Sequence, residues 1–300
     1  MTTSDAERKA LVLSICVPTY RRPGGLFLLL GALDAQRFGE APPEIRIVVV
    51  DNDETESARE VVDDARSWLR HRIHYRVEKR VGIPQARNAA LAAALASDWI
   101  AFIDDDEVPE PDWLDALLRT QRATGADVVT GPSLPRFVEP PPDWVVESRL
   151  FEPLRHATGA PVPTAYTNNV LARGAALRAL DSFFDERFTL GVGEDAELFA
   201  RVAAADGRIV WADDAIVYEN VPPARATLRW MLARGYRDGA ATAAAAPHGP
   251  VRIAAGAASC IARGLAAAAV GALRGRARCV RGLRLAMFGL GCGASLCGVR

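Results

Sequence analysis

The sequence lacks several features that would indicate particular classes of protein. Its 300 residues carry 36 Lys and Arg against 37 Asp and Glu, so the excess positive charge typical of nucleic-acid-binding proteins is absent. The five cysteines form no CxxC pair and no cluster with the four histidines. This scatter disfavours a zinc site or a disulfide framework and fits a reducing compartment. The N-terminal residues include acids and only a short apolar run, unlike a secretory signal. We therefore expect a cytoplasmic protein with no nucleic-acid partner.

Acidic residues are also absent from residues 239–300, which contain eight arginines and are rich in Ala, Gly and Leu. This shift in composition predicts one domain over residues 1–235 and a helical tail over residues 236–300.

The tail has two apolar runs, 251–273 and 283–290, on either side of the basic segment 274–284. The first run reaches the ~20 residues that span a bilayer, but its arginines and many alanines make it weakly hydrophobic. We expect a pair of interfacial helices attracted to anionic lipid. The alternative of a helical hairpin that packs on the first domain or on a second subunit stays open.

Short apolar segments rich in β-branched residues alternate with segments of helical periodicity over the first part of the chain. The predicted strands are 11–17, 44–50, 73–77 and 99–103, and the predicted helices are 26–36, 57–70 and 83–96. This alternation is typical of an α/β fold with a mostly parallel central sheet flanked by helices. Ligands of such folds bind at the carboxyl ends of the strands.

The rest of the chain gives weaker patterns. Helices are predicted at 113–124, 175–180 and 194–206, and strands at 126–131, 167–171, 208–211 and 215–218. Residues 132–163 are rich in proline and show no convincing periodicity. A long irregular insertion of this kind is usually a functional loop.

Three consecutive aspartates, Asp104, Asp105 and Asp106, follow the predicted strand 99–103. Alternate side chains of an extended segment share a face, so Asp104 and Asp106 can point the same way while Asp105 points elsewhere. Two carboxylates suit Mg²⁺ or Mn²⁺ and leave positions open for phosphate oxygens. The alternative is a solvated acidic turn. The polar loop 51–53, predicted at the same sheet edge, favours the metal.

Two further features could contribute to a site. Glu194 and Asp195 begin a predicted helix, whose N-terminus keeps a carboxylate ionised and able to act as a base. The alternative is an ordinary helix cap. Arg87 lies in the first turns of another predicted helix, where it can reach a phosphate or remain a surface arginine.

Five motifs of this chain resemble, in order, those of the family 2 glycosyltransferases, which are inverting enzymes of the GT-A fold that use nucleotide-sugar donors. The motifs are SICVPTYRR (14–22), IVVVDND (47–53), VGIPQARNAAL (81–91), AFIDDDEVPEPDWL (101–114) and GVGEDAELFARV (191–202). The resemblance covers residues 11 to about 220. It implies a Rossmann-like GT-A domain followed by the helical tail.

The resemblance also implies roles for individual residues. Around the nucleotide it implies Pro18, Thr19, Tyr20, Arg21, Asp51, Arg87, Asp104 and Asp105. It implies Asp106 with Asp104 as ligands of Mn²⁺ or Mg²⁺, Asp195 beside Glu194 as the catalytic base, and Asn168, Asn169 and Gly193 near the sugar or acceptor.

Three positions fit the family pattern less closely. The loop after the second strand reads Asp51-Asn52-Asp53, which leaves its contacts open. Many GT-A enzymes supply a histidine to the metal, whereas the matching region here reads VYENVPPAR, so Glu219 is a candidate third ligand or else a surface acid. Asn168 and Asn169 are candidates for donor contact or for buried structural amides.

The expected reaction transfers a sugar from a nucleoside-diphosphate sugar, with a UDP-sugar as the first choice, to a hydroxyl of a glycan or lipid-linked acceptor. Exopolysaccharide or other cell-surface glycan synthesis is the expected setting, and the tail is a candidate contact with the inner face of the cell membrane. One alternative is a sugar nucleotidyltransferase, although the loop 18–23 is not the glycine-rich basic loop such enzymes carry. The other is a non-catalytic nucleotide-sugar-binding scaffold, against which the intact Asp104, Asp106 and Asp195 argue.

Overall fold

The computed structural model describes residues 11–188, 193–245 and 249–296, and the chain divides into two compact units. The first unit comprises residues up to Ser133, Arg155–Asp185 and Leu198–Val217. The second comprises Leu134–Leu154, Glu186–Glu197 and Tyr218–Arg300.

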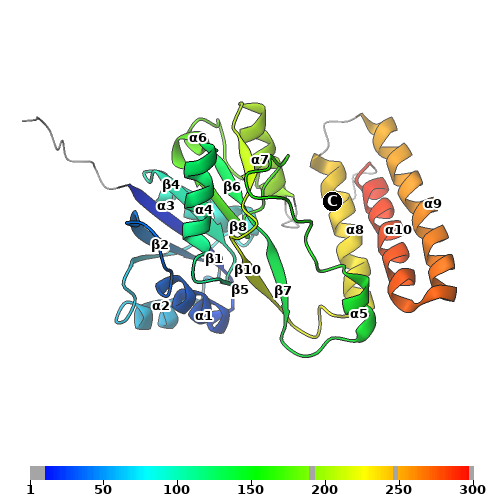
Figure 1. Cartoon of the computed structure of the whole chain (residues 1–300), viewed down its shortest axis with the longest axis horizontal. Helices are drawn as coiled ribbons and strands as arrows, with labels where there is room; N and C mark the ends of the chain where they lie inside the picture. Colours follow the sequence, from blue (N-terminus) through cyan, green and yellow to red (C-terminus); the bar gives the residue numbers. More distant parts are fainter. Residues whose placement is uncertain (1–10, 189–192, 246–248, 297–300) are drawn as a thin grey trace, which may run out of the picture. The chain divides into compact units, whose positions relative to one another are not determined.

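A seven-stranded sheet forms the centre of the first unit (Figure 1). Its order is β3 (Arg72–Val77), β2 (Glu44–Asp51), β1 (Val12–Thr19), β4 (Trp99–Ile103), β8 (Asn169–Arg173), β6 (Val128–Thr130) and β9 (Ile209–Trp211). Strands β3, β2, β1 and β4 are parallel, β6 is parallel to β9, and β8 runs antiparallel to both of its neighbours. The predicted mostly parallel sheet is confirmed, with β8 as the exception.

Helices cover both faces of this sheet because side chains alternate along each strand. Leu13, Ile15 and Val17 of β1 point to one face, which α1 (Pro23–Asp34), α2 (Arg59–Ala65) and α4 (Trp113–Thr124) cover. Cys16 points to the other face and packs in the core with residues of α3 (Ile83–Ala94), α6 (Gly174–Arg178) and the Leu198–Ala204 part of α7 (Glu194–Ala204). Both cores consist of nearly fully buried apolar side chains, and burial of each Val, Leu, Ile or Phe among them is worth about 1.5–3 kcal/mol.

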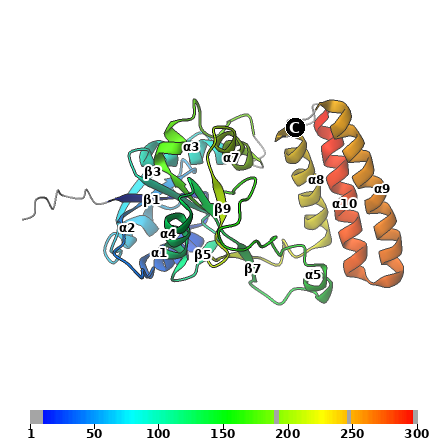
Figure 2. The same ribbon diagram turned by 45° about the horizontal axis from the view of Figure 1, so that its top comes forward.

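The second unit contains three long helices, α8 (Leu228–Ala245), α9 (Pro250–Arg274) and α10 (Arg276–Leu296). Helix α10 packs against both α8 and α9, and the three lie side by side in both views (Figures 1 and 2). Helix α8 begins at Leu228, so the predicted boundary at residue 235 falls within it.

The proline-rich segment 132–163, predicted to be irregular, contains two regular elements. They are β7 (Ser133–Phe137) and α5 (Asp143–Ser148). In the second unit β7 lies next to β10 (Val217–Val221), and Val138 donates a backbone hydrogen bond to Val221. Helix α5 packs its Trp144 and Val145 in an apolar cluster with residues of α8 and α10. A six-residue helix gives too short a pattern to recognise from sequence, and burial against α10 stabilises it here.

Candidate nucleotide and metal site

The polar loops predicted at the sheet edge follow the carboxyl ends of β1, β2 and β4. Thr19 and Asp51 are paired in the parallel register of β1 and β2, and Asn52 donates its backbone N–H to the Thr19 carbonyl at 2.8 Å. Asp104 follows the last residue of β4, which pairs with β1 on the other side. The sheet therefore brings these three loops to one edge, as expected for a parallel α/β fold.

Asp51 is fully buried and holds the loop after β2 in place. One carboxylate oxygen accepts hydrogen bonds from the Ala58 N–H at 2.7 Å and the Tyr75 hydroxyl at 2.9 Å, and the other accepts from the Asp53 N–H at 3.1 Å. Burial and the bond to Asp51 raise the pKa of Tyr75 above its usual value, so its hydroxyl remains a donor. Asp51 thus organises the loop in this structure, and its predicted contact with a base stays a prediction.

Asn52 joins the β2 loop to the segment that leads into α3. Its amide nitrogen donates to the carbonyls of Glu78 and Arg80 at 2.8 and 2.9 Å, and its amide oxygen accepts from the Gly82 N–H at 2.8 Å. Gly82 has φ +155° and precedes the first turn of α3, the helix that carries Arg87. The position of Arg87 thus depends on a hydrogen-bonded amide that the sequence motifs did not single out.

Arg21 and Asp53 form an ion pair across the loops after β1 and β2. The Arg21 Nε lies 3.0 Å from Asp53 Oδ2, and the guanidinium lies over the exposed Tyr20 ring at 5.0 Å from its centroid. Arg21 has φ 53°, a left-handed conformation that is uncommon for a residue with a side chain. The hydrogen bonds from Arg21 lower the pKa of Asp53 to about 2, so Asp53 is ionised at neutral pH.

The acidic run after β4 divides into one buried and two accessible carboxylates. The Asp105 side chain is 5% exposed and accepts hydrogen bonds from the Thr19 hydroxyl at 2.8 Å and from Arg22 Nη1 at 2.9 Å. The Asp104 and Asp106 side chains are 32% and 22% exposed. The predicted separation of Asp105 from its two neighbours is therefore present, although the three residues form a turn instead of an extended segment.

Two arginines lie beside the accessible pair. Arg22 Nη1 is 3.1 Å from Asp106 Oδ2, and Arg87 Nη2, from a largely buried side chain, is 3.3 Å from Asp104 Oδ1. Burial raises the pKa of Asp105 to about 6 despite its contact with Arg22. Carboxylates and guanidinium groups together can receive a cation and its bound phosphates.

Glu107, which the sequence motifs did not single out, links this loop to two other segments. It is buried, and its Oε1 accepts from the Ser133 hydroxyl at 2.8 Å and the Asn168 amide at 3.1 Å, while its Oε2 accepts from the Asp104 N–H at 3.3 Å. Burial raises the pKa of Glu107 well above its usual value, and the negative charge of Asp104 raises it further. The only sequence signal was a fourth acid in a row, which did not indicate its partners.

The two predicted asparagines differ in their surroundings. Asn168 is half-buried and donates to Glu107, which places it next to the acidic loop. Asn169 is buried, donates to the carbonyls of Pro132 and Ala215, and accepts from Trp113 Nε1 at 2.8 Å. These three hydrogen bonds fit the alternative of a buried structural amide, and the contact of Asn169 with a donor stays a prediction.

The accessible carboxylates of the acidic loop suit a hard divalent cation. Asp104 and Asp106 offer carboxylate oxygens, the ligands that Mg²⁺ and Mn²⁺ prefer. Among the residues the structure describes, no group of three or more His, Cys, Asp and Glu side chains forms a ready-made metal site.

The predicted catalytic residues lie in the second unit. Glu194 is buried and Asp195 is half-buried, both in the first turn of α7, with Asp195 Oδ1 accepting from the Ala196 N–H at 2.7 Å. Gly193 precedes them with φ +98°, a conformation that favours glycine. Gly191 and Val192 of the predicted turn lie outside the described residues.

Glu219, the candidate third metal ligand, lies on β10 in the second unit. Its carboxylate accepts a hydrogen bond from Arg225 Nη1 at 2.6 Å. The structure thus gives it an arginine partner, and its role as a ligand stays a prediction.

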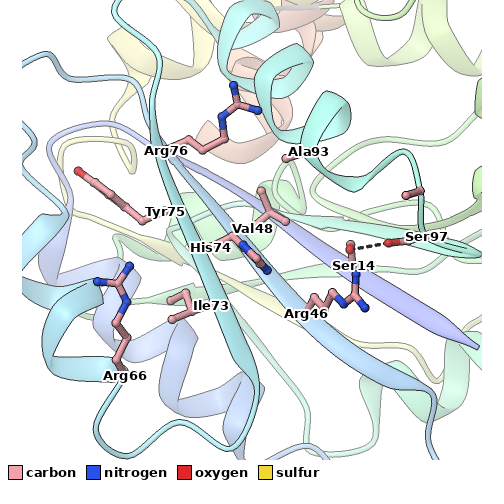
Figure 3. Close-up of a pocket in the computed structure, with 11 residues that line it drawn as sticks. Ser14, Arg46, Val48, Arg66, Ile73, His74, Tyr75, Arg76, Ala93 and Ser97 are labelled. Atoms are coloured by element: carbon pink, nitrogen blue, oxygen red, sulfur yellow. Dashed lines mark hydrogen bonds between the residues drawn. The ribbon is translucent and has the colours of Figure 1, made fainter. Parts of the chain in front are cut away.

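A hollow of about 340 Å³ in the first unit is lined by none of the predicted site residues (Figure 3). It includes Arg46, His74 and Arg76 on β2 and β3, and the hydrogen-bonded hydroxyls of Ser14 and Ser97, which lie 2.7 Å apart. Because it wraps around the edge strand β3, we attribute it to the open edge of the sheet.

Comparisons with known proteins identify the family of this chain. Residues 14–180 match the family described as "Glycosyl transferase family 2", and residues 99–271 match "Glycosyl transferase family group 2". The succinoglycan biosynthesis protein ExoM of Rhizobium meliloti (strain 1021) is 35% identical over 231 residues, which cover 77% of this chain and 74% of that protein. The validoxylamine A glucosyltransferase of Streptomyces hygroscopicus subsp. limoneus is 28% identical over 221 residues, and the chain spans about half of its length (48%).

Two solved structures share the fold. The S. aureus TarS 1–349 structure in complex with UDP has a TM-score of 0.53 at 21% identity, covering 75% of this chain and 64% of that chain. The Pyrobaculum calidifontis mannosyltransferase PcManGT, solved with GDP-Man and Mn²⁺, has a TM-score of 0.61 at 18% identity, covering 97% of this chain and 88% of that chain. At these identities the likeness supports the fold and not a particular donor.

Proposed function

Because the chain belongs to glycosyl transferase family 2 and is a glycosyltransferase, we propose that it transfers a sugar from a nucleoside-diphosphate sugar to an acceptor hydroxyl with inversion, using a divalent cation. The observation that carries this proposal is the pairing of the accessible Asp104 and Asp106 with Arg87 and Arg22 at the carboxyl edge of a parallel sheet. TarS with UDP or UDP-GlcNAc and PcManGT with GDP-Man support a nucleotide-sugar donor. A UDP-sugar is the first donor to test.

Asp104 and Asp106 would hold the cation, either Mn²⁺ or Mg²⁺. When bound, such a cation stabilises the negative charge that develops on the diphosphate leaving group. Arg22 and Arg87 add positive charge on the protein side, and because Arg87 is largely buried its guanidinium is fixed in place. Asp105, held by Thr19 and Arg22, keeps the loop in shape beneath the two accessible acids.

Asp195 would act as the base. It would take the proton from the acceptor hydroxyl as the oxygen attacks the anomeric carbon, and the bond from that carbon to the diphosphate oxygen would break in the same step. A single displacement from the face opposite the leaving group inverts the configuration. Asp195 lies in the first turn of α7, as the family motif predicts for this base.

The likeness to ExoM, a succinoglycan biosynthesis protein, supports a role in exopolysaccharide or other cell-surface glycan synthesis. A glycan or a lipid-linked molecule is the acceptor that we propose. The five cysteines are scattered along the sequence, a pattern that fits a reducing compartment and so supports the cytoplasm as the site of the reaction. We also propose that residues up to about 235 form the catalytic GT-A domain and that the remainder is a helical appendage.

The role of Asp195 is tested by release of sugar from UDP-sugars and by transfer to a candidate acceptor, with the anomeric configuration of the product read by NMR. The Asp195→Asn variant is expected to lose 10²- to 10⁴-fold in rate and to keep UDP affinity. Glu197→Gln, in the same first turn of α7, is the matched control and should keep both. An Asp195→Asn variant with unchanged turnover, or a product of retained configuration, would contradict the mechanism.

A further inference from the structure

Helix α9 carries an apolar surface that faces away from its helical neighbours. Val251 and Leu273 are 81% and 91% exposed, and Leu265 and Val270 are about half exposed. Among the residues that the structure describes, α9 is the one helix long and apolar enough to cross a membrane by length and composition, and only 17% of its most apolar stretch is buried. A helix of a soluble domain normally presents a polar face to water.

The opposite face of α9 is already used by α10. Ala257, Gly264, Ala268 and Gly271 are its buried residues, spaced along one stripe of the helix. The two helices are so close that a Cβ atom on Gly264 would meet the backbone of Ala286. Packing of α9 on α10 therefore accounts for the inner face and leaves the outer face without a partner among the described residues of the second unit.

Three exposed arginines follow one edge of this outer face. Arg252, Arg263 and Arg274 are 11 residues apart, which is three turns, so they form a nearly straight row about 33 Å long beside the apolar surface. No acid occurs in residues 239–300 to neutralise them. A row of cations beside a continuous apolar strip is the pattern of a helix that lies in a membrane interface.

We infer that the outer face of α9 binds the surface of an anionic lipid bilayer. Val251, Leu265 and Leu273 would enter the boundary between headgroups and acyl chains, and the arginine row would contact lipid phosphates. The absence of acids favours a negatively charged surface over an uncharged partner. A second copy of this chain would bring two arginine rows together, which disfavours self-association through this face.

The arginine row also distinguishes lying on the membrane from crossing it. Arg263 is one residue from the midpoint of α9, so a spanning orientation would place its charge near the centre of the hydrocarbon, where charged side chains are costly. In a parallel orientation all three arginines reach the headgroups at the same depth. The geometry therefore favours peripheral binding.

The test is cosedimentation of the full chain with phosphatidylcholine vesicles, with and without phosphatidylglycerol. Binding is expected only with the anionic lipid and should fall as salt is raised. An α9 charge variant, with Arg252, Arg263 and Arg274 all changed to Gln, should bind on the order of 100-fold more weakly, at about fivefold for each arginine. Leu265→Ser with Leu273→Ser should also weaken binding at unchanged circular dichroism.

The matched control changes Arg59, Arg66 and Arg70 to Gln, which removes the same net charge from exposed arginines that each pair with a nearby acid. It should bind vesicles like the wild type. Equal weakening in the control would overturn the inference, because bulk charge would then explain binding. Resistance of bound protein to alkaline carbonate extraction would also overturn the inference, because it would indicate a membrane-spanning helix. So would the absence of vesicle binding together with a dimer that the α9 charge variant loses, because the face would then bind a second copy of the chain.

Discussion

Replacing Gly25 of α1 by alanine should disturb the acidic loop 104–106, although α1 contributes no side chain to that loop. Gly25 lies in the first turn of α1, and a Cβ atom there would be 2.5 Å from the backbone carbonyl oxygen of Asp105. That separation is well below van der Waals contact, and the obstructing atom is backbone, so either α1 or the loop must move. The hydrogen bonds from Thr19 and Arg22 to Asp105 would be strained by either movement.

The magnitude follows from two opposing effects. Alanine in a helix is favoured over glycine by up to about 1 kcal/mol, whereas overpacking a tight contact costs about 1–3 kcal/mol. Gly25→Ala should therefore lower the free energy of unfolding by about 0–2 kcal/mol. Its effect on ligand binding should be larger than its effect on stability, since the displaced residues flank Asp104 and Asp106, and we expect at least tenfold weaker UDP binding in the presence of Mn²⁺, about 1.4 kcal/mol.

Two glycines of the same helix serve as controls. A Cβ atom at Gly24 or Gly31 would meet nothing within 4 Å, so alanine there should keep or slightly raise stability and leave UDP binding unchanged. Denaturant unfolding and titration calorimetry on the three variants would measure both quantities. If Gly25→Ala behaves like the two controls, the close packing of α1 on the acidic loop does not shape the site.

Three further predictions follow from the buried polar groups. Because the pKa of Asp105 is raised to about 6, its contribution to stability is complete below about pH 4 and is lost as the pH rises through 6, by about 3 kcal/mol. Asp105→Asn should remove this pH-dependent loss of stability when unfolding is measured in the presence of a chelator. A variant with the same pH profile as the wild type would refute the prediction. The lowered pKa of Asp53 predicts the opposite sign: its pairing stabilises above about pH 4 and is lost as the pH falls towards 2, and Arg21→Gln should abolish that dependence in acid unfolding. Tyr75→Phe removes a hydrogen bond to the buried Asp51 and should cost about 1.5–3 kcal/mol of unfolding free energy, whereas a cost near zero would mean that Asp51 does not need this donor.

Local patterns were sufficient to predict the strands that position the site. Apolar runs ending in polar residues located β1, β2 and β4, and their alternation with helices predicted the parallel pairing that places Thr19 beside Asp51. Asp105 also separates from Asp104 and Asp106 as predicted, but it does so through a turn and not through the strand alternation on which the prediction was based. These features depend on neighbours in sequence, which is why they could be predicted.

Features that depend on distant partners were not predictable. Glu107 is held by Ser133 and Asn168, which are 26 and 61 residues away, and nothing near it in sequence indicates those partners. Asn169 is taken up by three internal hydrogen bonds that form only once β8 is placed in the sheet. The antiparallel direction of β8 likewise depends on the path of the chain through the proline-rich segment.

The central claim is that the acids after β4 hold a cation that in turn holds the diphosphate of the donor. It is tested most directly by calorimetric titration of UDP, GDP, dTDP and CMP, each with and without Mn²⁺, into the wild type, Asp106→Ala and the surface control Asp112→Ala. Metal-dependent binding of one nucleotide, weakened at least tenfold in Asp106→Ala and unchanged in Asp112→Ala, is the expected result. Binding that is indifferent to both the metal and Asp106, or no binding of any nucleotide, would contradict the account.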